Sequence, residues 1–333
     1  MTATAASPPT KVANPPLRSW VPTMLLLAVL WGCSFLFIGV GIRELHPTYV
    51  TLFRVAAGAV TLLIIMAITR QRLPRSLKLW GHLFVLGATN AVLPFTLFGY
   101  GEQHIPSLLA GIWNGTTPLL VLPFAAFLFR TERFTAPKVA GLVVGFLGVL
   151  VVLGAWHGTG GAGLAGQMMC FAASACYGFS VPYQHRFLAS TSESGMALSA
   201  GLLISATAQL AVIAPLLAGG APPSPLDLSP EVIASVLALG ILGTGIALAL
   251  NLRNIRIVGG STASMVTYII PVVAVIVGVL VLDEHVFWYQ PVGAAVIMLG
   301  VAFSQGRFSR RRRQPEAEVP PVVVASGQVT PAD

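Results

Sequence analysis

A few polar and aromatic residues interrupt the long apolar stretches of this 333-residue chain. Through an indole or phenol ring, an amide or a hydroxyl, they could bind a polar molecule inside an apolar protein. These candidate binding residues are Trp31, Ser34, Asn90, Trp113, Asn114, Tyr177, Ser180, Thr267 and Tyr268. Arg54 is the one basic residue in the middle of such a stretch. Because an ionisable residue in apolar surroundings is costly, it is either paired or functional. The sequence allows both roles, an ion pair with Glu44 or Glu102 or a gating or binding role.

Two prolines, Pro118 and Pro271, stand in the middle of two similar apolar stretches. A proline inside a helix removes the hydrogen bond to the carbonyl four residues earlier, which frees the carbonyls of Asn114 and Thr267. At membrane depth, a free carbonyl must face protein or a water-filled cavity. Two interpretations follow. Either each proline makes a packed kink, with threonine hydroxyls bonded to their own helix, or the kinks turn Asn114 and Tyr268 toward a central cavity.

Two aromatic residues are each followed by a serine three positions later, so that both side chains share one helical face. These pairs are Trp31 with Ser34 and Tyr177 with Ser180. Both aromatic rings lie too deep in their stretches to be interfacial anchors, and so they either line a cavity or pack in the core. Asn90 raises a similar choice, because its amide must bond either to neighbouring helices or to a bound molecule.

The composition of the chain indicates that these residues lie in a membrane protein. Charged residues make up 9% of the chain, hydrophobic residues 55%, and the mean hydropathy is +0.82. A soluble protein carries about 25% charged residues, so this chain lacks the polar surface that water requires. Apolar stretches near the length of a membrane span recur ten times. We place them at 21–42, 48–68, 79–100, 107–129, 138–155, 164–184, 196–218, 232–252, 261–282 and 290–305.

Basic residues gather on one side of the predicted spans. If the N-terminus is cytoplasmic, seventeen of the nineteen Lys and Arg residues fall in cytoplasmic segments. They are Lys11, Arg18, Arg70, Arg72, Arg75, Lys78, Arg130, Arg133, Lys138, Arg186, Arg253, Arg256, Arg307 and Arg310 to Arg313. Only Arg43 lies on the other side, and Arg54 lies within a span. This bias predicts a multi-pass protein of the cell membrane with both termini in the cytoplasm, rather than a nucleic-acid surface.

The chain also repeats itself. The segment "PLLVLPFAAFLFRTERF" at 118–134 returns as "PVVAVIVGVLVLDEHVF" at 271–287, and Glu132 and Glu284 are 152 residues apart. The second copy has lost the flanking arginines. A duplicated unit with five spans must enter the membrane upside down the second time, which moves the second glutamate to the side that disfavours arginine. We expect both glutamates to cap or pin loops against the following helix.

Glycines follow the same spacing. Gly141 and Gly148 recur as Gly293 and Gly300, again 152 residues apart. Small residues at such spacing let helices approach closely, either within the chain or at a homodimer face. The sequence therefore predicts an all-α membrane protein of ten transmembrane helices, built as two inverted five-helix repeats at 20–155 and 156–305. The segments 1–19 and 306–333 are predicted to be disordered cytoplasmic tails, the second of them basic.

In order and spacing, the motifs resemble the EamA-type branch of the drug/metabolite transporter superfamily. The resemblance rests on "WG" in the first span, "LFRVAAGA" in the second, "NGTTPLL…RTERF" in the fourth, "GLVVGFLGV" in the fifth and "YIIPVVAVIVGVLVLDE" in the ninth. It covers residues 20–305. It implies the same ten-helix fold and the movement of small metabolites, often amino acids or purine-like compounds, frequently outward. The family pattern retains Arg54, whereas the second copy has Tyr177 in place of Trp31.

Absent motifs narrow the function further. No Asp or Glu falls within the ten predicted spans, so a buried carboxylate proton relay has no candidate. The ATP-binding, zinc-protease and serine-hydrolase motifs are missing. We therefore predict no enzyme activity, cofactor or metal site. The prediction is a secondary transporter that exports a small metabolite by alternating access around a midplane cavity. The alternatives are a structural or sensory membrane protein, or a membrane-embedded enzyme. Partners are a small-molecule substrate and the lipid bilayer, not nucleic acid, and a homodimer stays open.

Overall fold

The computed structural model describes residues 16–154 and 162–305, and within these ranges it contains helices and no strands. The helices are α1 (Val21–Gly41), α2 (Pro47–Ile68), α3 (Leu77–Gly87), α4 (Leu93–Glu102), α5 (Ser107–Asn114), α6 (Thr117–Pro123), α7 (Ala136–Val152), α8 (Ala162–Leu188), α9 (Gly195–Ala218), α10 (Pro230–Gly240), α11 (Ala247–Ala263), α12 (Val266–Leu282) and α13 (Tyr289–Ser304). A 3₁₀ turn, η1 (Leu17–Ser19), precedes α1. Most of the two predicted tails lies outside the described residues.

Each of the ten predicted apolar stretches coincides with one helix or with consecutive helices. Seven of these units in the described chain are long and apolar enough to cross a membrane, namely Val21–Gly41, Pro47–Ile68, Leu77–Glu102, Ser107–Leu128, Gly163–Leu188, Gly195–Ala218 and Pro230–Gly259. The helices α7, α12 and α13 are also apolar but have only 16 or 17 residues. The all-helical membrane class predicted from the sequence is thus confirmed.

Local sequence explains where several helices begin. Ser76, Ser194 and Ser229 precede α3, α9 and α10, and each hydroxyl accepts a hydrogen bond from a backbone N–H in the first turn. Serine is a favoured N-cap because its side chain satisfies one of the free amides of the first turn. Pro47 opens α2 and Pro230 opens α10, where the missing N–H costs nothing.

Several helices are interrupted in the middle. The π-helical segments η2 (Ala88–Val92) and η5 (Ile241–Ile246) join α3 to α4 and α10 to α11, and they begin 153 residues apart. A turn at 115–116 separates α5 from α6, just before Pro118, and a turn at 264–265 precedes α12. Pro271 lies inside the uninterrupted α12. Interruptions of this kind often mark functional sites, because they turn side chains and backbone groups away from the regular helix.

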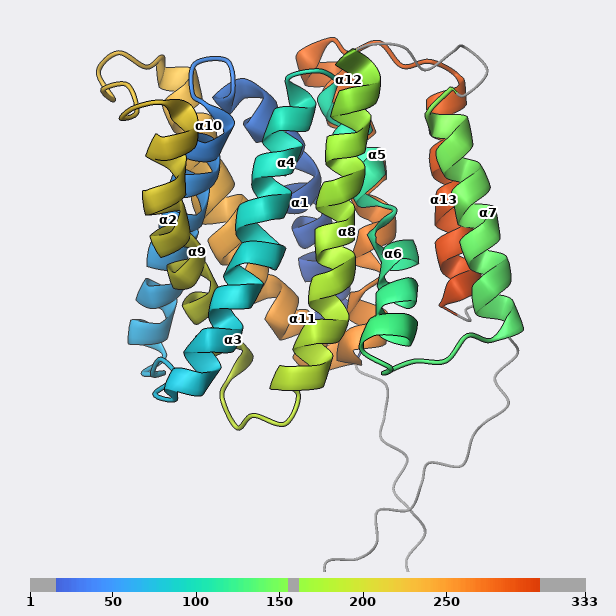
Figure 1. Ribbon diagram of the computed structural model, residues 1–333, viewed down its shortest axis with the longest axis horizontal. Coiled ribbons are helices and arrows are strands. Elements are labelled where there is room, and N and C mark those ends of the chain that lie inside the picture. The colour runs from blue at the N-terminus through green and yellow to red at the C-terminus, as the bar shows by residue number, and fades with distance from the viewer. Residues whose placement is uncertain (1–15, 155–161, 306–333) are drawn as a thin grey trace, which may run out of the picture.

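The helices α7 and α13 form a closely packed antiparallel pair at one side of the bundle (Figure 1). A methyl group placed on Gly148 would lie 2.9 Å from the carbonyl oxygen of Gly293, and one placed on Gly293 would lie 2.9 Å from the carbonyl oxygen of Gly148. Gly300 approaches Gly141 in the same way, at 2.6 Å. The repeated glycines therefore pack against each other within the chain: Gly148 lies against Gly293, and Gly141 lies against Gly300.

Other contacts follow the same pattern. The second helix of each half packs against the other, α2 against α9. In addition, α2 packs on α10 and η5, and α9 packs in the equivalent way on α3 and η2. Similarly, α1 lies against α12, and α8 lies against α5 and α6. The main hydrophobic core contains Trp113, which is 1% exposed, together with Phe35 and Phe98. A second core joins α2, α3 and α9.

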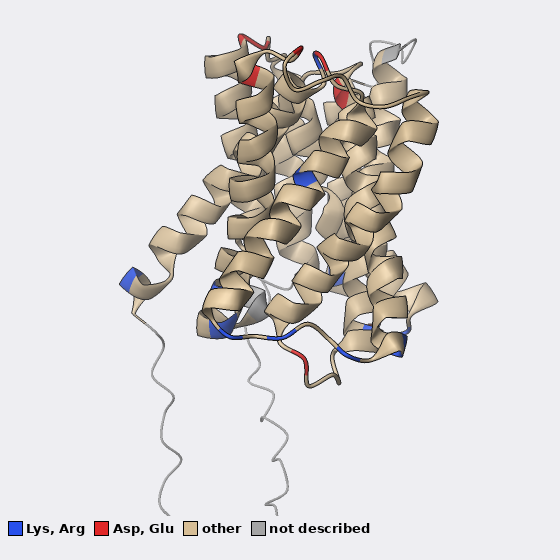
Figure 2. Ribbon diagram, turned by 90° about the vertical axis from the view of Figure 1, so that its left-hand side faces the viewer, with Lys and Arg blue, Asp and Glu red and all other residues tan. Residues whose placement is uncertain are grey.

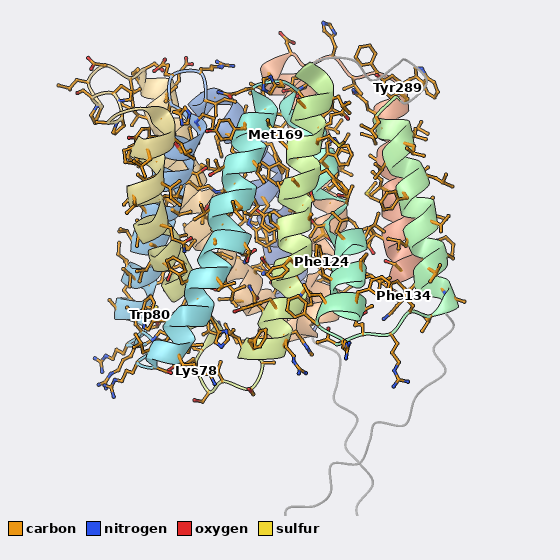
Figure 3. All side chains as sticks on the ribbon, in the orientation of Figure 1. Lys78, Trp80, Phe124, Phe134, Met169 and Tyr289 are labelled. Atoms are coloured by element: carbon orange, nitrogen blue, oxygen red, sulfur yellow. The ribbon has the colours of Figure 1, made fainter. Side chains whose placement is uncertain are left out.

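Charged residues separate along the helices (Figure 2). Lysines and arginines gather at one end of the bundle, and aspartates and glutamates gather mostly at the other. Figure 3 shows Lys78 and Trp80 at the basic end and Tyr289 at the opposite end. One basic position lies at mid-height inside the bundle. Arg54 is eight residues into α2, and it is buried, with 6% of its surface exposed.

Candidate functional site

The site is built around Arg54. Its Nε donates a hydrogen bond to the Thr244 hydroxyl at 3.0 Å, and its Cζ lies 3.5 Å from the centre of the Phe95 ring. Thr244 belongs to η5 of the second half, and its own hydroxyl donates to the carbonyl of Leu239 at 2.9 Å. Phe95 lies in α4. A cation over an aromatic face is attracted by the ring quadrupole, and so the side chain of Arg54 is held from two sides.

Arg54 makes no ion pair within residues 16–154 and 162–305, which corrects the expected pairing with Glu44 or Glu102. Glu44 instead accepts a hydrogen bond from the backbone N–H of Ser229 at 2.8 Å, and this bond holds the pKa of Glu44 below its usual range. The terminal nitrogens of the Arg54 guanidinium have no protein acceptor in the same part of the chain. A buried guanidinium with free donors offers a planar fork that matches a carboxylate.

Tyr177 of α8 brings a second aromatic wall to this place. Its ring lies 6.3 Å from those of Phe95 and Phe98, so that Phe95 has Tyr177 and Arg54 as neighbours. We call Arg54, Phe95, Phe98, Tyr177 and Thr244 the arginine cluster. It joins α2 and α4 of the first half to α8 and η5 of the second. Of the residues predicted from sequence, Arg54 and Tyr177 meet here.

Two predicted residues keep unbonded amides. Asn90 lies in η2 and Asn114 ends α5, and both are half-buried. Neither side chain forms a hydrogen bond within the described residues. Of the two roles open to Asn90, bonding to neighbouring helices is not seen in this conformation. An amide that is partly sheltered and unbonded can still accept and donate hydrogen bonds to a bound molecule.

Other predicted residues are bonded to the protein. Ser34 donates to the carbonyl of Leu30 in its own helix, and Thr267 donates to the carbonyl of Ser264 in the turn before α12. The Thr267 hydroxyl thus follows the packed-kink interpretation, in which threonine bonds back along the chain, and the Ser34 hydroxyl is likewise bonded within the protein. The residue Trp31, on the same helix as Ser34, is half-buried and packs against the main hydrophobic core.

Trp113 and Ser180 link α8 to other helices. The Trp113 indole donates to the Gln167 side chain at 3.3 Å, and Ser180 lies 3.0 Å from the Thr89 hydroxyl of η2. Ser180 also donates to the carbonyl of Cys176. Both residues are buried, so in this conformation they hold helices together.

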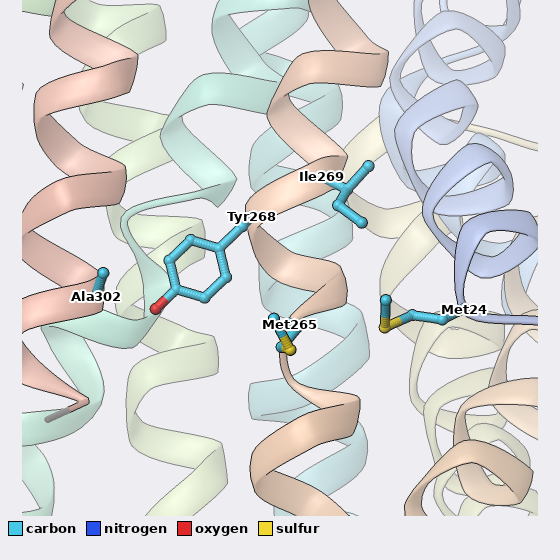
Figure 4. Close-up of a pocket in the computed structure, with 5 residues that line it drawn as sticks. All are labelled: Met24, Met265, Tyr268, Ile269 and Ala302. Carbon is cyan, nitrogen blue, oxygen red and sulfur yellow. The ribbon is translucent and has the colours of Figure 1, made fainter. Parts of the chain in front are cut away.

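Tyr268 lies in different surroundings from Tyr177. It lines an apolar pocket of about 260 Å³ with Met24, Met265, Ile269 and Ala302. Figure 4 shows its ring reaching from α12 toward Ala302 of α13, with Met24 on the other side of the pocket. Its hydroxyl donates to the side chain of Gln305 at 3.0 Å. Its polar end thus points toward α13.

Three glutamates carry bonds that the sequence predicts only in part. Glu132 pairs with Lys138 at 2.7 Å and so pins the loop before α7, as expected. Glu284 accepts from the backbone N–H groups of Ser107 and Leu108, and so it caps α5 of the other half rather than the following helix. Glu102 corrects the prediction that no acidic residue lies within a span. It ends the candidate span Leu77–Glu102, and one of its carboxyl oxygens is sealed from solvent. The spans thus do include a carboxyl group.

Sequence reasoning missed Phe95, Phe98 and Thr244. A phenylalanine or threonine in an apolar helix carries no signal of its own, because both residues are ordinary there. One signal is visible afterwards: Phe95 follows Pro94 directly, and Thr244 stands between Gly243 and Gly245. Proline and paired glycines accompany irregular helical turns. Pro94 lies two residues after η2, and Thr244 lies within η5.

One family model matches the chain twice, once in each half. The model of the EamA-like transporter family matches residues 18–154 and again 164–305. The chain belongs to the EamA-like transporter family. It is therefore a membrane transporter of the EamA type, as the sequence motifs predicted, and the family model matches each half of the chain once.

Three relatives match this chain along most of their own length. The uncharacterized transporter YoaV of Bacillus subtilis is 24% identical over 87% of this chain and 97% of its own. The uncharacterized transporter YdfC of the same organism is 26% identical over 84% and 88%. A probable terminal-alkyne amino-acid exporter of Streptantibioticus cattleyicolor is 27% identical over 90% and 97%. A solved crystal structure shares the fold with a TM-score of 0.61, over 88% of this chain and 99% of the other, at 21% identity.

Proposed function

We propose that this EamA-family protein is a secondary transporter that exports a small carboxylate-bearing metabolite, such as an amino acid. Arg54 binds the carboxylate of the substrate. The observation that carries the proposal is the buried guanidinium of Arg54, which has an aromatic face and one threonine as partners but no anion among the described residues.

The cost of this arrangement supports a functional role. A buried charge without a counter-charge is expensive, and removing it often stabilises a protein. Such a residue fits a site whose anion arrives with the substrate. The guanidinium fork would accept the two oxygens of a carboxylate, and its aromatic neighbours Phe95 and Tyr177 would shelter these bonds from water.

The aromatic and amide residues suggest what the rest of the substrate is like. The rings of Phe95, Phe98 and Tyr177 offer apolar contact, and the unbonded amides of Asn90 and Asn114 offer polar contact. The substrate is therefore small, with one acidic end and an apolar or amphipathic body. The name of the Streptantibioticus cattleyicolor relative, a probable amino-acid exporter, agrees with this class. Contacts from Trp31, Ser34, Trp113, Ser180, Thr267 and Tyr268 require movement from their present bonds or surroundings and stay predictions.

For the architecture, we propose ten membrane spans in two inverted five-helix units, at 20–155 and 156–305, with alternating access between them. The antiparallel packing of α7 on α13 supports it, because Gly141 and Gly148 face the counterparts of each other. Equivalent helices that pack antiparallel are related by a two-fold axis perpendicular to the helices, which is how inverted repeats are arranged. The helices α7, α12 and α13 lie at or just below the lower end of the usual span length of about 17–25 residues.

The direction in the membrane follows from charge. The basic end of the bundle in Figure 2 would face the cytoplasm, together with both chain termini. The arginine cluster would then lie between the two membrane faces, where a substrate could reach it from either side in turn.

Metabolite profiling tests the proposal. The medium and cell contents of strains that overexpress the wild-type protein, the Arg54→Gln variant or no protein are compared at equal membrane expression. We expect one or a few carboxylate-bearing metabolites to accumulate in the medium of the wild-type strain alone. Export of only uncharged or cationic compounds, or equal export by Arg54→Gln, would contradict the proposed role of Arg54.

A further inference from the structure

The carboxyl group of Glu102 has an unusual environment at the end of α4. Its Oε2 accepts a hydrogen bond from the Ser107 hydroxyl at 2.6 Å. Its Oε1 is sealed from solvent and has no hydrogen-bond partner in the described residues. Helix α1 closes over this place without a side chain, since a methyl group on Gly39 would lie 3.3 Å from Oε2 and 2.7 Å from the Ser107 hydroxyl.

Within the described residues, two charged groups act on this carboxyl. The positive charge of Arg54 in α2 influences it electrostatically, although the two groups are too far apart for an ion pair. Glu284 adds a second negative charge nearby. The Cys170 thiol of α8 packs against Gly101, the residue before Glu102. Glu284 is already occupied, because it accepts the N–H groups of Ser107 at 2.6 Å and Leu108 at 2.9 Å. Ser107 therefore joins two carboxyl groups, one from each half of the protein.

The surroundings of Glu102 match a protonated carboxyl group better than an anion. A buried carboxylate oxygen without a donor loses the hydration that it has in water, and nothing in the described structure replaces it. To ionise, the group must gain water or a donor. Because Oε1 is sealed from solvent in this conformation, either would reach it only if α4 moved against the helices that pack around it.

We propose that Glu102 is a proton-binding site and that it takes up and releases one proton in each transport cycle. The inference rests on the proposed transport function. When the helices separate, the carboxyl reaches water and releases its proton; when they close again, it must first be protonated. The step moves one proton between water and a carboxylate oxygen and needs no other reactant. Proton movement is thereby tied to the opening and closing of the acidic end of the bundle.

Infrared difference spectroscopy of the purified protein in lipid tests the proton site without any substrate. A protonated carboxyl group has a carbonyl stretching band that a carboxylate lacks. At neutral pH, we expect wild-type protein to show the band of a buried protonated carboxyl, and Glu102→Gln to lack it. Glu132→Gln is the matched control, since Glu132 is exposed and paired with Lys138; it should keep the band. A wild-type protein without the band, or a Glu102→Gln variant that retains it, would overturn the proposal.

Coupling is tested in cells once profiling has named an exported metabolite. Dissipating the proton gradient should lower net export by the wild-type protein severalfold and leave the residual export by Glu102→Gln unchanged. Glutamine keeps the acceptor for Ser107, so the variant should fold. Equal sensitivity of both proteins to the gradient would refute coupling through Glu102. The infrared result stands apart from the substrate: a band that depends on Glu102, together with no exported carboxylate, would refute only the proposed function.

Discussion

The guanidinium carbon of Arg54 lies 3.5 Å from the centre of the Phe95 ring, and no acidic side chain in the described structure comes within ion-pair distance of that guanidinium. Among the described residues, its one side-chain hydrogen bond reaches Thr244, in the other half of the chain. The residue therefore stands between the halves, held in place but without a counter-charge. This arrangement makes predictions about the effect of Arg54 on the stability of the protein and on transport.

Replacing Arg54 by glutamine should leave the thermal stability of the protein unchanged or raise it, because the variant no longer buries an unpaired charge. Transport should fall at least tenfold. A hydrogen bond to a charged group is worth about 1.5–3 kcal/mol, and each 1.4 kcal/mol is about a factor of ten in affinity. Unfolding in detergent and export at equal expression measure the two effects.

The exposed Arg43 offers a matched control, since Arg43→Gln removes the same charge outside the helices. It should change neither quantity. If Arg54→Gln unfolds at a clearly lower temperature than wild type, the arginine is part of the packing and the substrate role loses its support.

The amides of Asn90 and Asn114 should be dispensable for stability. Because neither forms a hydrogen bond within the described residues, alanine at either position leaves no partner stranded. We expect each variant to lose less than about 1 kcal/mol of unfolding free energy and to transport severalfold more slowly. Gln209→Ala is the opposite case, since Gln209 donates to the carbonyl of Phe84 at 2.9 Å and is buried. It should lose more stability than either asparagine variant. Normal transport by Asn114→Ala would assign that residue to the packed kink.

The close packing of α7 on α13 predicts a strong effect of bulk at Gly148. In Gly148→Leu the new side chain would meet the backbone of α13, since even a methyl group would lie 2.6 Å from the Ile297 nitrogen. Overpacking of this kind costs typically about 1–3 kcal/mol, and here rigid backbone must move. Gly81→Leu has open space around it and should fold normally. Size-exclusion profiles and melting temperatures compare the two, and equal behaviour would mean that α7 and α13 can separate freely.

The membrane orientation can be tested by cysteine labelling. Ser224→Cys places a thiol in the exposed loop between α9 and α10, which the charge distribution assigns to the outside. An impermeant thiol reagent should label it in intact cells and should not label Ser309→Cys in the C-terminal segment. The native cysteines are first replaced, so that only the introduced thiol reacts. Labelling of Ser309→Cys but not of Ser224→Cys would reverse the proposed orientation.

Much of the fold follows from sequence because a membrane leaves few choices. Apolar length predicted every helical unit, and the 152-residue spacing of Gly141 with Gly293 predicted positions that the structure packs together. What the spacing could not predict is which residues would meet. Two copies of one unit carry the same motif, but only the folded bundle shows that Gly148 lies against Gly293 rather than against a second molecule.

The site was less predictable. Arg54 and Tyr177 stand out in the sequence, because a charge or a phenol at membrane depth is costly, and the structure brings them together. Thr244 does not stand out, since its role depends on η5 turning it toward a helix 190 residues away. Glu102 was misjudged because α4 extends two residues past the predicted span, and its burial depends on α1 and α5 rather than on its own segment. Local sequence does not reveal burial by helices that are distant along the chain.

The carboxylate contact at Arg54 is tested most directly by comparing an acid with its methyl ester. Purified wild-type and Arg54→Gln proteins are reconstituted in liposomes, and exchange of the metabolite identified by profiling is measured against exchange of its ester. We expect wild-type protein to prefer the acid by about tenfold or more, which is the worth of one charged hydrogen bond, and Arg54→Gln to lose this preference. An equal preference for the acid in both proteins would show that the carboxylate binds elsewhere and would rule out Arg54 as its binding residue.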